Sequence, residues 1–172
     1  MTADDQQQLD ELLERFDTAM LVTGTPTGML RARPMAVAAH RDGGILYFAT
    51  RVEDGKLDEL IADARVAVTM QQGNRYVSIT GIARIEIDRA LAEEIWSAAM
   101  RVWFPEGASD PALVLIRVEP ERAEFWDRSG VRALEFYWQA GHALVTGEKP
   151  DDQTLSGHEK LSFRRAADRA GH

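Results

Sequence analysis

The sequence predicts a mainly β protein, in which about six antiparallel strands form a closed or nearly closed barrel with a few flanking helices. The chain has 172 residues, of which 45% are hydrophobic and 28% charged, enough for one soluble domain with a real core. Most strand-like segments are joined by tight turns, such as "RDGG" at residues 41–44 and "QGNR" at residues 72–75. Strands joined by tight turns pair antiparallel, and several such strands with few helices favour a barrel.

The individual elements follow from hydrophobic spacing and turn residues. Apolar residues recur at helical spacing over about residues 5–16, which predicts a first helix. The expected strands cover residues 19–40 (two strands joined by a turn at 25–28), 45–50, 65–71, 76–87, 112–120 and 121–130. The expected helices cover residues 55–64 and 88–104, and Asp88 is the N-cap of the second. Gly81 inside the strand over 76–87 predicts a bulge or a close approach of another backbone.

Residues 1–146 are expected to form the barrel domain, and residues 147–172 a flexible tail. The tail region is polar, contains Pro150 and carries charges of both signs. The chain shows no repeat at a fixed period, so a repeat architecture is not expected.

Charge and composition exclude several classes of function. The chain has 20 Lys and Arg against 28 Asp and Glu, a net charge of −8, which argues against binding along a nucleic-acid backbone. It has no cysteine, which excludes disulfides and thiolate chemistry. No stretch approaches the roughly 20 apolar residues of a membrane span, and the acidic start does not resemble a secretory signal, so we expect a cytoplasmic protein. The histidine-metal, nucleophile-elbow and dinucleotide-binding motifs are also missing from the sequence.

A group of cationic residues stands out in this acidic chain. Arg31 and Arg33 share one face of a predicted strand, and Pro34 between two strand positions implies an edge, a bulge or a break. Backbone groups beside such a break are free to meet a planar ligand. The alternative is a pair of surface arginines that discourages aggregation of an edge strand.

A second cationic segment follows the strand over 45–50. Thr50, Arg51 and Lys56 lie between the end of that strand and the start of a helix, where hydroxyl, guanidinium, ammonium and backbone N–H groups suit a phosphate. Glu53 and Asp54 in the same segment offer the alternative, because they could pair with these cations or cap the helix. The unresolved question is whether the counter-ion is a protein carboxylate or a bound anion.

Aromatic residues gather in two further places. Trp103 and Phe104 precede a loop, "PEG", and Phe125 and Trp126 lie in a late strand. A tryptophan in such a loop fits an interface or a stacking surface for a flat ligand. Ordinary packing against the barrel is the alternative for at least one of these rings.

In order along the chain, "RARPM", "LYFAT" followed by Lys56, "YVSITGIARI", "WFPEG" and "LVLIRVEPERAEFWD" resemble the general stress protein 26 group. That group belongs to the pyridoxamine 5′-phosphate oxidase-like superfamily of FMN-binding split β-barrels. The resemblance covers about residues 8–140. It implies a six-stranded antiparallel split barrel that forms a homodimer, with an FMN in each cleft between the subunits.

The resemblance also implies site residues. Arg33 and Lys56 would bind the phosphate with Thr50, and Trp126, Trp103 and Phe104 would cover the ring from the partner chain. The implied cofactor-binding residues are Arg33, Pro34, Met35, Ala36, Phe48, Ala49, Thr50, Arg51, Lys56, Trp103, Phe104 and Trp126.

The sequence also departs from the pyridoxamine phosphate oxidases. It lacks their Arg-x-His substrate motif after Trp126, so vitamin B6 oxidation is not expected, and it has Tyr76 where those enzymes carry a glutamine near the flavin. The expected function is therefore that of an FMN-binding stress-type flavoprotein, either an oxidoreductase of unknown substrate or a non-catalytic flavin-binding or flavin-sensing protein. Related split barrels that use deazaflavin F420 or haem are the alternative for the cofactor.

Overall fold

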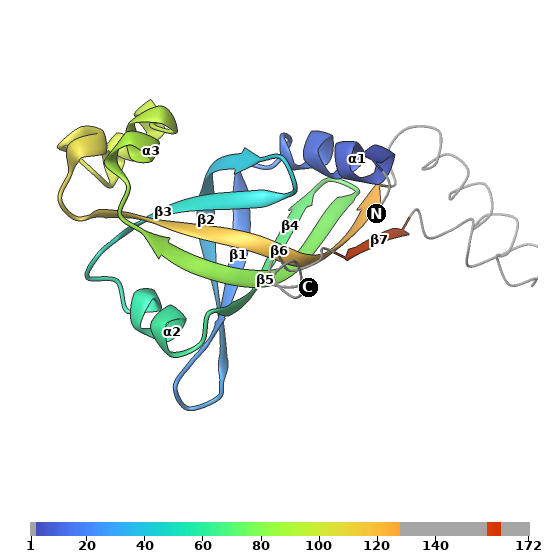
Figure 1. The fold of residues 1–172 in the computed structure, drawn as a ribbon, viewed down its shortest axis with the longest axis horizontal. Coiled ribbons are helices and arrows are strands. Elements are labelled where there is room, and N and C mark those ends of the chain that lie inside the picture. The colour runs from blue at the N-terminus through green and yellow to red at the C-terminus, as the bar shows by residue number, and fades with distance from the viewer. Residues whose placement is uncertain (1–2, 128–157, 163–172) are drawn as a thin grey trace, which may run out of the picture.

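A computed structural model, which describes residues 3–127 and 158–162, shows the expected antiparallel barrel (Figure 1). Its strands are β1 (Thr18–Gly24), β2 (Leu30–Arg41), β3 (Ile45–Arg51), β4 (Arg65–Gln72), β5 (Arg75–Glu86), β6 (Leu113–Asp127) and β7 (His158–Ser162). The strands pair in the order β3-β2-β1-β4-β5-β6-β7, and an additional pairing of β3 with β6 closes the first six into a barrel. Every pairing is antiparallel.

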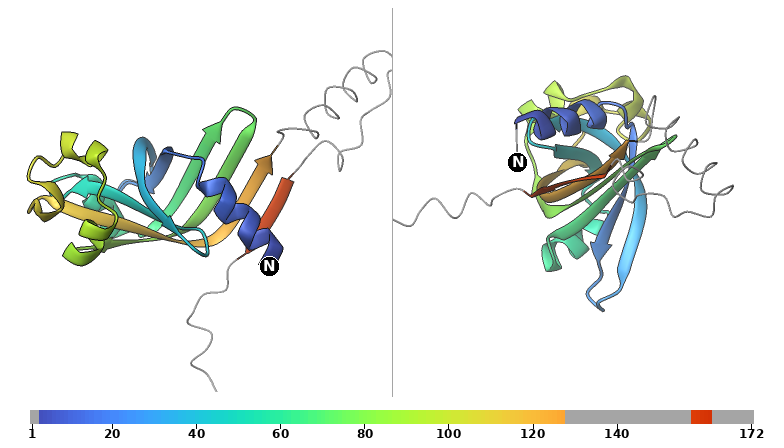
Figure 2. Two further views of the ribbon diagram at one scale, coloured as in Figure 1. Left: turned by 90° about the horizontal axis from the view of Figure 1, so that it is seen from above. Right: turned by 90° about the vertical axis from the view of Figure 1, so that its right-hand side faces the viewer.

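The helices of the described residues are short and lie outside the barrel wall. They are α1 (Ala3–Leu13), α2 (Lys56–Ala62), α3 (Arg89–Glu94) and the 3-10 helices η1 (Ala98–Val102) and η2 (Gly107–Ser109). Figure 2 shows α1 and α3 toward opposite ends of the long strands. Helix α1 ends at Leu13, three residues before the predicted end, although Phe16 remains buried beside it.

The apolar residues form two separate clusters. The larger one fills the barrel, where residues of β1, β3, β4, β5 and β6 meet Leu9 and Leu13 of α1 and Leu57 and Leu60 of α2. The smaller one lies outside the barrel wall, where Tyr47 and Leu115 pack against Ile95, Met100 and Phe104 of the α3–η1 region. The outer cluster fixes the segment between β5 and β6 against the barrel.

The helix predicted over residues 88–104 is wrong in its length. Asp88 does cap α3, because its carboxylate accepts the Leu91 N–H at 3.0 Å, but α3 ends at Glu94 and η1 begins at Ala98. In one continuous helix, Ile95 and Phe104 could not face the barrel together, because nine residues turn the helix by about half a revolution. The break lets both side chains pack into the outer cluster.

The two predicted strands over 112–120 and 121–130 are a single strand, β6, as far as Asp127, and residues 128–130 lie outside the described residues. Pro120 does not end it, because Pro120 lies opposite Gly81 at the register shift between β5 and β6. The predicted bulge and close approach at Gly81 are both confirmed: a Cβ there would stand 2.1 Å from the Glu119 carbonyl oxygen. Glycine at this position of β5 lets the two backbones approach, so β6 stays paired with β5 on both sides of Pro120.

Residues 158–162 of the predicted tail form β7, which pairs with β6 between Arg122 and Trp126. The rest of the predicted tail lies outside the described residues, so its flexibility stays a prediction.

Replacing Gly81 by alanine should lower the free energy of unfolding by about 3 kcal/mol or prevent folding, since one of two backbones must move. Chemical denaturation followed by circular dichroism measures the change. Gly55→Ala is the matched control, because a Cβ at Gly55 meets nothing within 4 Å and its φ of −58° suits any residue. A Gly81→Ala protein as stable as the control would contradict the close approach.

Candidate functional site

Strands β2 and β3 separate at one end of the barrel, and we call this separation the β2–β3 split. Val37–Arg41 of β2 pair with Ile45–Phe48 of β3, whereas residues 30–36 pair with β1 alone among the described strands. On the other side, Ala49, Thr50 and Arg51 pair with β6. A register shift between Val37 and Ala39 marks the point of separation. The edge, bulge or break predicted at Pro34 is therefore present.

Backbone groups of β2 face the split at alternate residues. The Val37 N–H donates to the Asp17 carbonyl at 3.0 Å, on the side of β1. Since successive residues of a strand point their backbone groups in opposite directions, Pro34 and Ala36 direct theirs toward the split. Pro34 has no N–H to place there, which is why proline is tolerated at this position.

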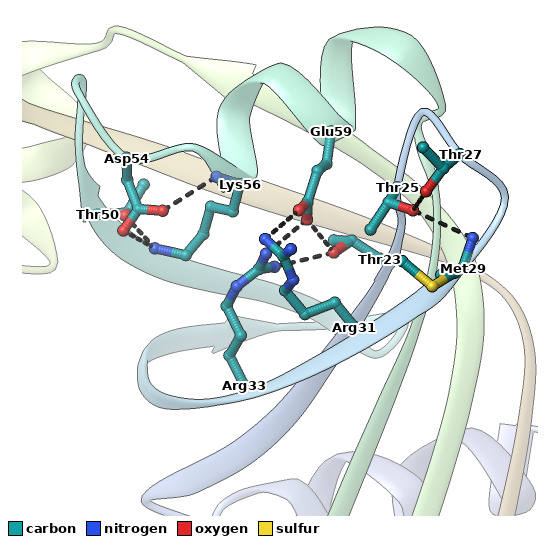
Figure 3. Close-up of polar contacts among 10 residues, drawn as sticks. All are labelled: Thr23, Thr25, Thr27, Met29, Arg31, Arg33, Thr50, Asp54, Lys56 and Glu59. Carbon is teal, nitrogen blue, oxygen red and sulfur yellow. Dashed lines mark hydrogen bonds and ion pairs between the residues drawn. The ribbon is translucent and has the colours of Figure 1, made fainter.

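Two arginines of β2 meet one carboxylate of α2 beside the split (Figure 3). Arg31 Nη1 lies 2.8 Å from Glu59 Oε1, and Arg33 Nη2 lies 2.6 Å from Glu59 Oε2. The common face predicted for Arg31 and Arg33 is confirmed by this shared partner. Met35, two residues further, packs against the barrel cluster instead.

Thr23 of β1 completes this network. Its hydroxyl donates to Glu59 Oε2 at 2.6 Å and accepts a hydrogen bond from Arg33 Nη1 at 2.9 Å. Burial raises the pKa of Glu59, but the hydrogen bonds from Thr23 and Arg33 and the charges of both arginines outweigh it. The pKa of Glu59 therefore lies below its usual value, and the group is an anion at neutral pH.

Lys56 forms the second half of the site. Its buried ammonium group donates to the Thr50 hydroxyl at 2.8 Å and forms an ion pair with Asp54. Asp54 also accepts the Lys56 backbone N–H at 3.0 Å, so the amide at the start of α2 already has a partner. Burial raises the pKa of Asp54, but its hydrogen bonds and ion pair with Lys56 prevail and hold that pKa below the usual value.

These two halves form what we call the cation cluster: Arg31, Arg33, Thr50 and Lys56 with the carboxylates Asp54 and Glu59. Arg33 is close enough to Asp54 to lower its pKa, so the halves share one electrostatic environment. Three positive groups face two negative ones, which leaves a net charge of one positive unit. Protein carboxylates are thus the partners of these cations here, and one unit of positive charge remains for an anion.

The other cofactor-binding residues expected near the phosphate fall in different surroundings. The Arg51 side chain is exposed. Its Nε lies 3.5 Å from Glu53 Oε2, and its Nη1 donates to the Trp103 carbonyl at 3.2 Å. Ala49 is the first residue of β3 after the β2–β3 pairing ends, and it pairs with β6. The Phe48 side chain is fully buried in the barrel, and its backbone pairs with both neighbouring strands.

The aromatic residues separate into three environments. Trp103 is 68% exposed at the end of η1, while Phe104 is only 2% exposed inside the outer cluster. The structure therefore does not bring Phe104 to a surface where it could cover a ligand, because its ring is used for packing. Trp126 lies opposite Tyr76 of β5 and His158 of β7.

Trp126 is also far from the cation cluster along its own strand. Thr50 pairs with Val114 of β6, twelve positions before Trp126, which is roughly 40 Å at strand spacing. Figure 1 shows the same separation, with the α3 end of β6 and β7 at opposite ends of the molecule. One chain therefore cannot bring Trp126 and the cation cluster to the same small ligand.

Sequence reasoning missed Glu59 and Thr23. A signal was present for Glu59, which follows Lys56 by three positions and so shares its side of α2. Thr23 lies two residues after the buried Leu21 on β1, so both side chains are on the inward face of the strand. The sequence around Thr23 and Glu59 does not show which arginine each will contact, because β2 and α2 come together only in the closed barrel.

Among residues 3–127 and 158–162, no group of His, Asp and Glu is arranged to hold a metal ion. No helix in this part of the chain is long and apolar enough to cross a membrane.

Comparison with curated proteins finds two relatives. The chain is 32% identical to Protein bli-3 of Neurospora crassa over 117 residues, which are 62% of this chain and only 56% of that protein. It is 29% identical to General stress protein 26 of Bacillus subtilis over 123 residues, 69% of this chain and 85% of that protein.

Among solved structures, the chain resembles the general stress FMN/FAD binding protein of Xanthomonas citri, with a TM-score of 0.63 and 27% identity over 75% of this chain and 92% of that one. The family model described as pyridoxamine 5′-phosphate oxidase like matches residues 4–151. This match spans most of the chain, including the whole six-stranded barrel and the split with its cation cluster. The chain therefore belongs to the pyridoxamine 5′-phosphate oxidase-like family.

Proposed function

We propose that this chain is an FMN-binding flavoprotein and that the cation cluster binds the FMN phosphate. The observation that carries the proposal is the meeting of Arg33 of β2, Thr50 of β3 and Lys56 of α2 at the β2–β3 split. A phosphate monoester requires guanidinium, ammonium and hydroxyl donors in one place. The related protein of Xanthomonas citri, which is named for binding FMN or FAD, supports the same ligand class.

The flavin ring would lie along the open edge of β2. Pro34 and Ala36 direct their backbone groups toward the split, and a flavin ring needs such polar groups at its edge and apolar cover over its face. This position would continue from the phosphate end at Arg33 toward Met35 and Ala36, in accord with the residues expected from sequence.

A second copy of the chain would complete the site. Trp126 lies too far along β6 to reach a ligand held at Thr50 of the same chain. Trp103 is largely exposed, as expected of a side chain that a partner covers. We therefore propose a homodimer in which Trp126 approaches the flavin bound to the other subunit, while Trp103, whose carbonyl accepts from Arg51, lies at the phosphate end of its own chain.

The redox chemistry in this proposal would be supplied by the flavin itself. The residues of the chain would hold the phosphate, orient the ring and limit the access of water. A flavin-dependent oxidoreductase of unknown substrate is the favoured activity, and a flavin-binding protein without turnover is the alternative.

The experiment that tests the proposal is mass spectrometry of the chromophore released from the purified native protein. The expected result is FMN, and the intact protein should then show flavin absorbance. Reduction of the bound flavin by NADH or NADPH, followed by reoxidation with added acceptors, would support an oxidoreductase. A bound F420 or haem, or no affinity for added FMN, would contradict the proposal.

Removing both charges from the phosphate site should weaken FMN binding strongly. In Arg33→Met with Lys56→Met, two charge-assisted hydrogen bonds are lost, so we expect a loss of about 3 kcal/mol or more, at least a hundredfold in Kd. Titration followed by flavin fluorescence measures the change. Riboflavin, which lacks the phosphate, should bind the variant and the native protein alike, and Arg65→Met at the exposed pair with Asp63 should have no effect. Full FMN affinity in the double variant would refute the phosphate assignment.

A site shared between two chains predicts complementation. Trp126→Ala alone should change the absorbance and fluorescence of bound flavin more than its affinity. Mixing Trp126→Ala chains with Arg33→Met, Lys56→Met chains should produce heterodimers with one site that carries both defects and one that carries neither. Native flavin spectra and affinity should then return for about half of the sites in those heterodimers. No recovery, although subunit exchange is demonstrated by tagged chains, would place Trp126 outside the shared site.

A further inference from the structure

Glu59 is the carboxylate that ties the two arginines of the cation cluster together. Its side chain is 5% exposed, against 19% for Arg33 and 58% for Arg31. We propose that Glu59 is an internal competitor for Arg33, so that a bound phosphate takes Arg33 away from Glu59 while Arg31 keeps Glu59 paired. This inference rests on the proposed phosphate site.

The guanidinium group of Arg33 is already engaged at both terminal nitrogens. Nη2 lies 2.6 Å from Glu59 Oε2, and Nη1 donates to Thr23 at 2.9 Å. A guanidinium binds a carboxylate or a phosphate best with two parallel N–H groups. The two Nη groups thus already serve Glu59 and Thr23, so a phosphate that approaches this end of the guanidinium group competes with Glu59 for Arg33.

Glu59 can release Arg33 without becoming an unpaired buried charge. Its two oxygens accept from three groups, and after the exchange the Thr23 hydroxyl at 2.6 Å and Arg31 at 2.8 Å would remain. An unpaired buried carboxylate is strongly unfavourable, so the exchange needs a second cation that stays behind. Arg31 has that role, and its effect on the ligand passes through Glu59 rather than through direct contact.

The carboxylate also opposes the phosphate by charge. A phosphate monoester close to Arg33 would stand near the negative charge of Glu59, and like charges at such distances repel appreciably where water is partly excluded. Glu59 thus lowers the affinity of the cation cluster for dianions and leaves the affinity for an uncharged flavin unaffected. It acts as a specificity-determining residue that sets how strongly FMN is preferred over riboflavin.

The test compares FMN with riboflavin in four proteins: the native chain, Glu59→Gln, Arg31→Met and the double variant. Glu59→Gln should bind FMN about tenfold more tightly or better, since one charged competitor is removed, and riboflavin unchanged. Arg31→Met should weaken FMN binding several-fold in the native background and by less than about twofold in the Glu59→Gln background. Asp58→Asn removes the same charge from the neighbouring, exposed position of α2 and should leave both affinities unchanged.

Two results of this comparison would overturn the inference alone. One is Glu59→Gln binding FMN no more tightly than the native protein, although the native protein prefers FMN to riboflavin. The other is Arg31→Met weakening FMN binding equally in both backgrounds, which would make Arg31 a direct ligand. A native protein with no preference for FMN over riboflavin would overturn the proposed phosphate site and this inference with it.

A crystal structure of the native protein with FMN tests the exchange without any variant. Glu59 should still contact Thr23 and Arg31, while Arg33 contacts the phosphate and no longer lies within hydrogen-bond distance of Glu59. A bound phosphate with the Arg33–Glu59 contact intact would overturn the inference.

Discussion

The pairing of β3 with β2 over part of its length and with β6 up to its end is the constraint on which the rest of the structure depends. β3 pairs with β6 from Leu46 to Arg51, which closes the barrel, but its pairing with β2 ends at Phe48, so residues 30–36 of β2 are paired on one side only. Closure removes most sheet edges, and the early end of the β2–β3 pairing leaves one short, defined stretch of edge. The same separation brings Thr50 to the end of β3 and allows Lys56 of α2 to approach it. The same strand, β3, therefore closes the barrel and contributes Thr50 to the candidate site.

Charge balance explains why this opening can hold so many cations in an acidic protein. Each buried or partly buried cation has a carboxylate within ion-pair distance, so none bears the full cost of desolvation. The pairing is incomplete by one charge, and Arg31 and Arg33 share a single carboxylate. A fully neutralised cluster would give an anion little to bind, and an uncompensated one would destabilise the barrel. One shared carboxylate satisfies both requirements, and it makes the partners of the arginines exchangeable.

The sequence could predict what depends on local rules. Turn residues and alternating strands indicated the barrel, Pro34 the break in β2, Gly81 the close approach to Glu119, and the spacing of Arg31 and Arg33 their common face. It could not predict what depends on contacts between distant segments. Glu59 meets the arginines only after α2 docks, and the helix over 88–104 breaks because the barrel wall requires Ile95 and Phe104 on the same side. Helical propensity alone gave no reason for that break.

The two ends of the proposed ligand would depend on different levels of organisation. The phosphate end is built by β2, β3 and α2 of one chain, so its geometry follows from folding of that chain alone. The aromatic end would come from Trp126, roughly 40 Å along β6 from the residue that pairs with Thr50, so it would exist only where two copies associate. A ligand that contacts both copies binds the dimer more tightly than the monomer, and by linkage it stabilises the dimer to the same extent. In the proposed homodimer, cofactor loading and subunit association are therefore two aspects of one equilibrium.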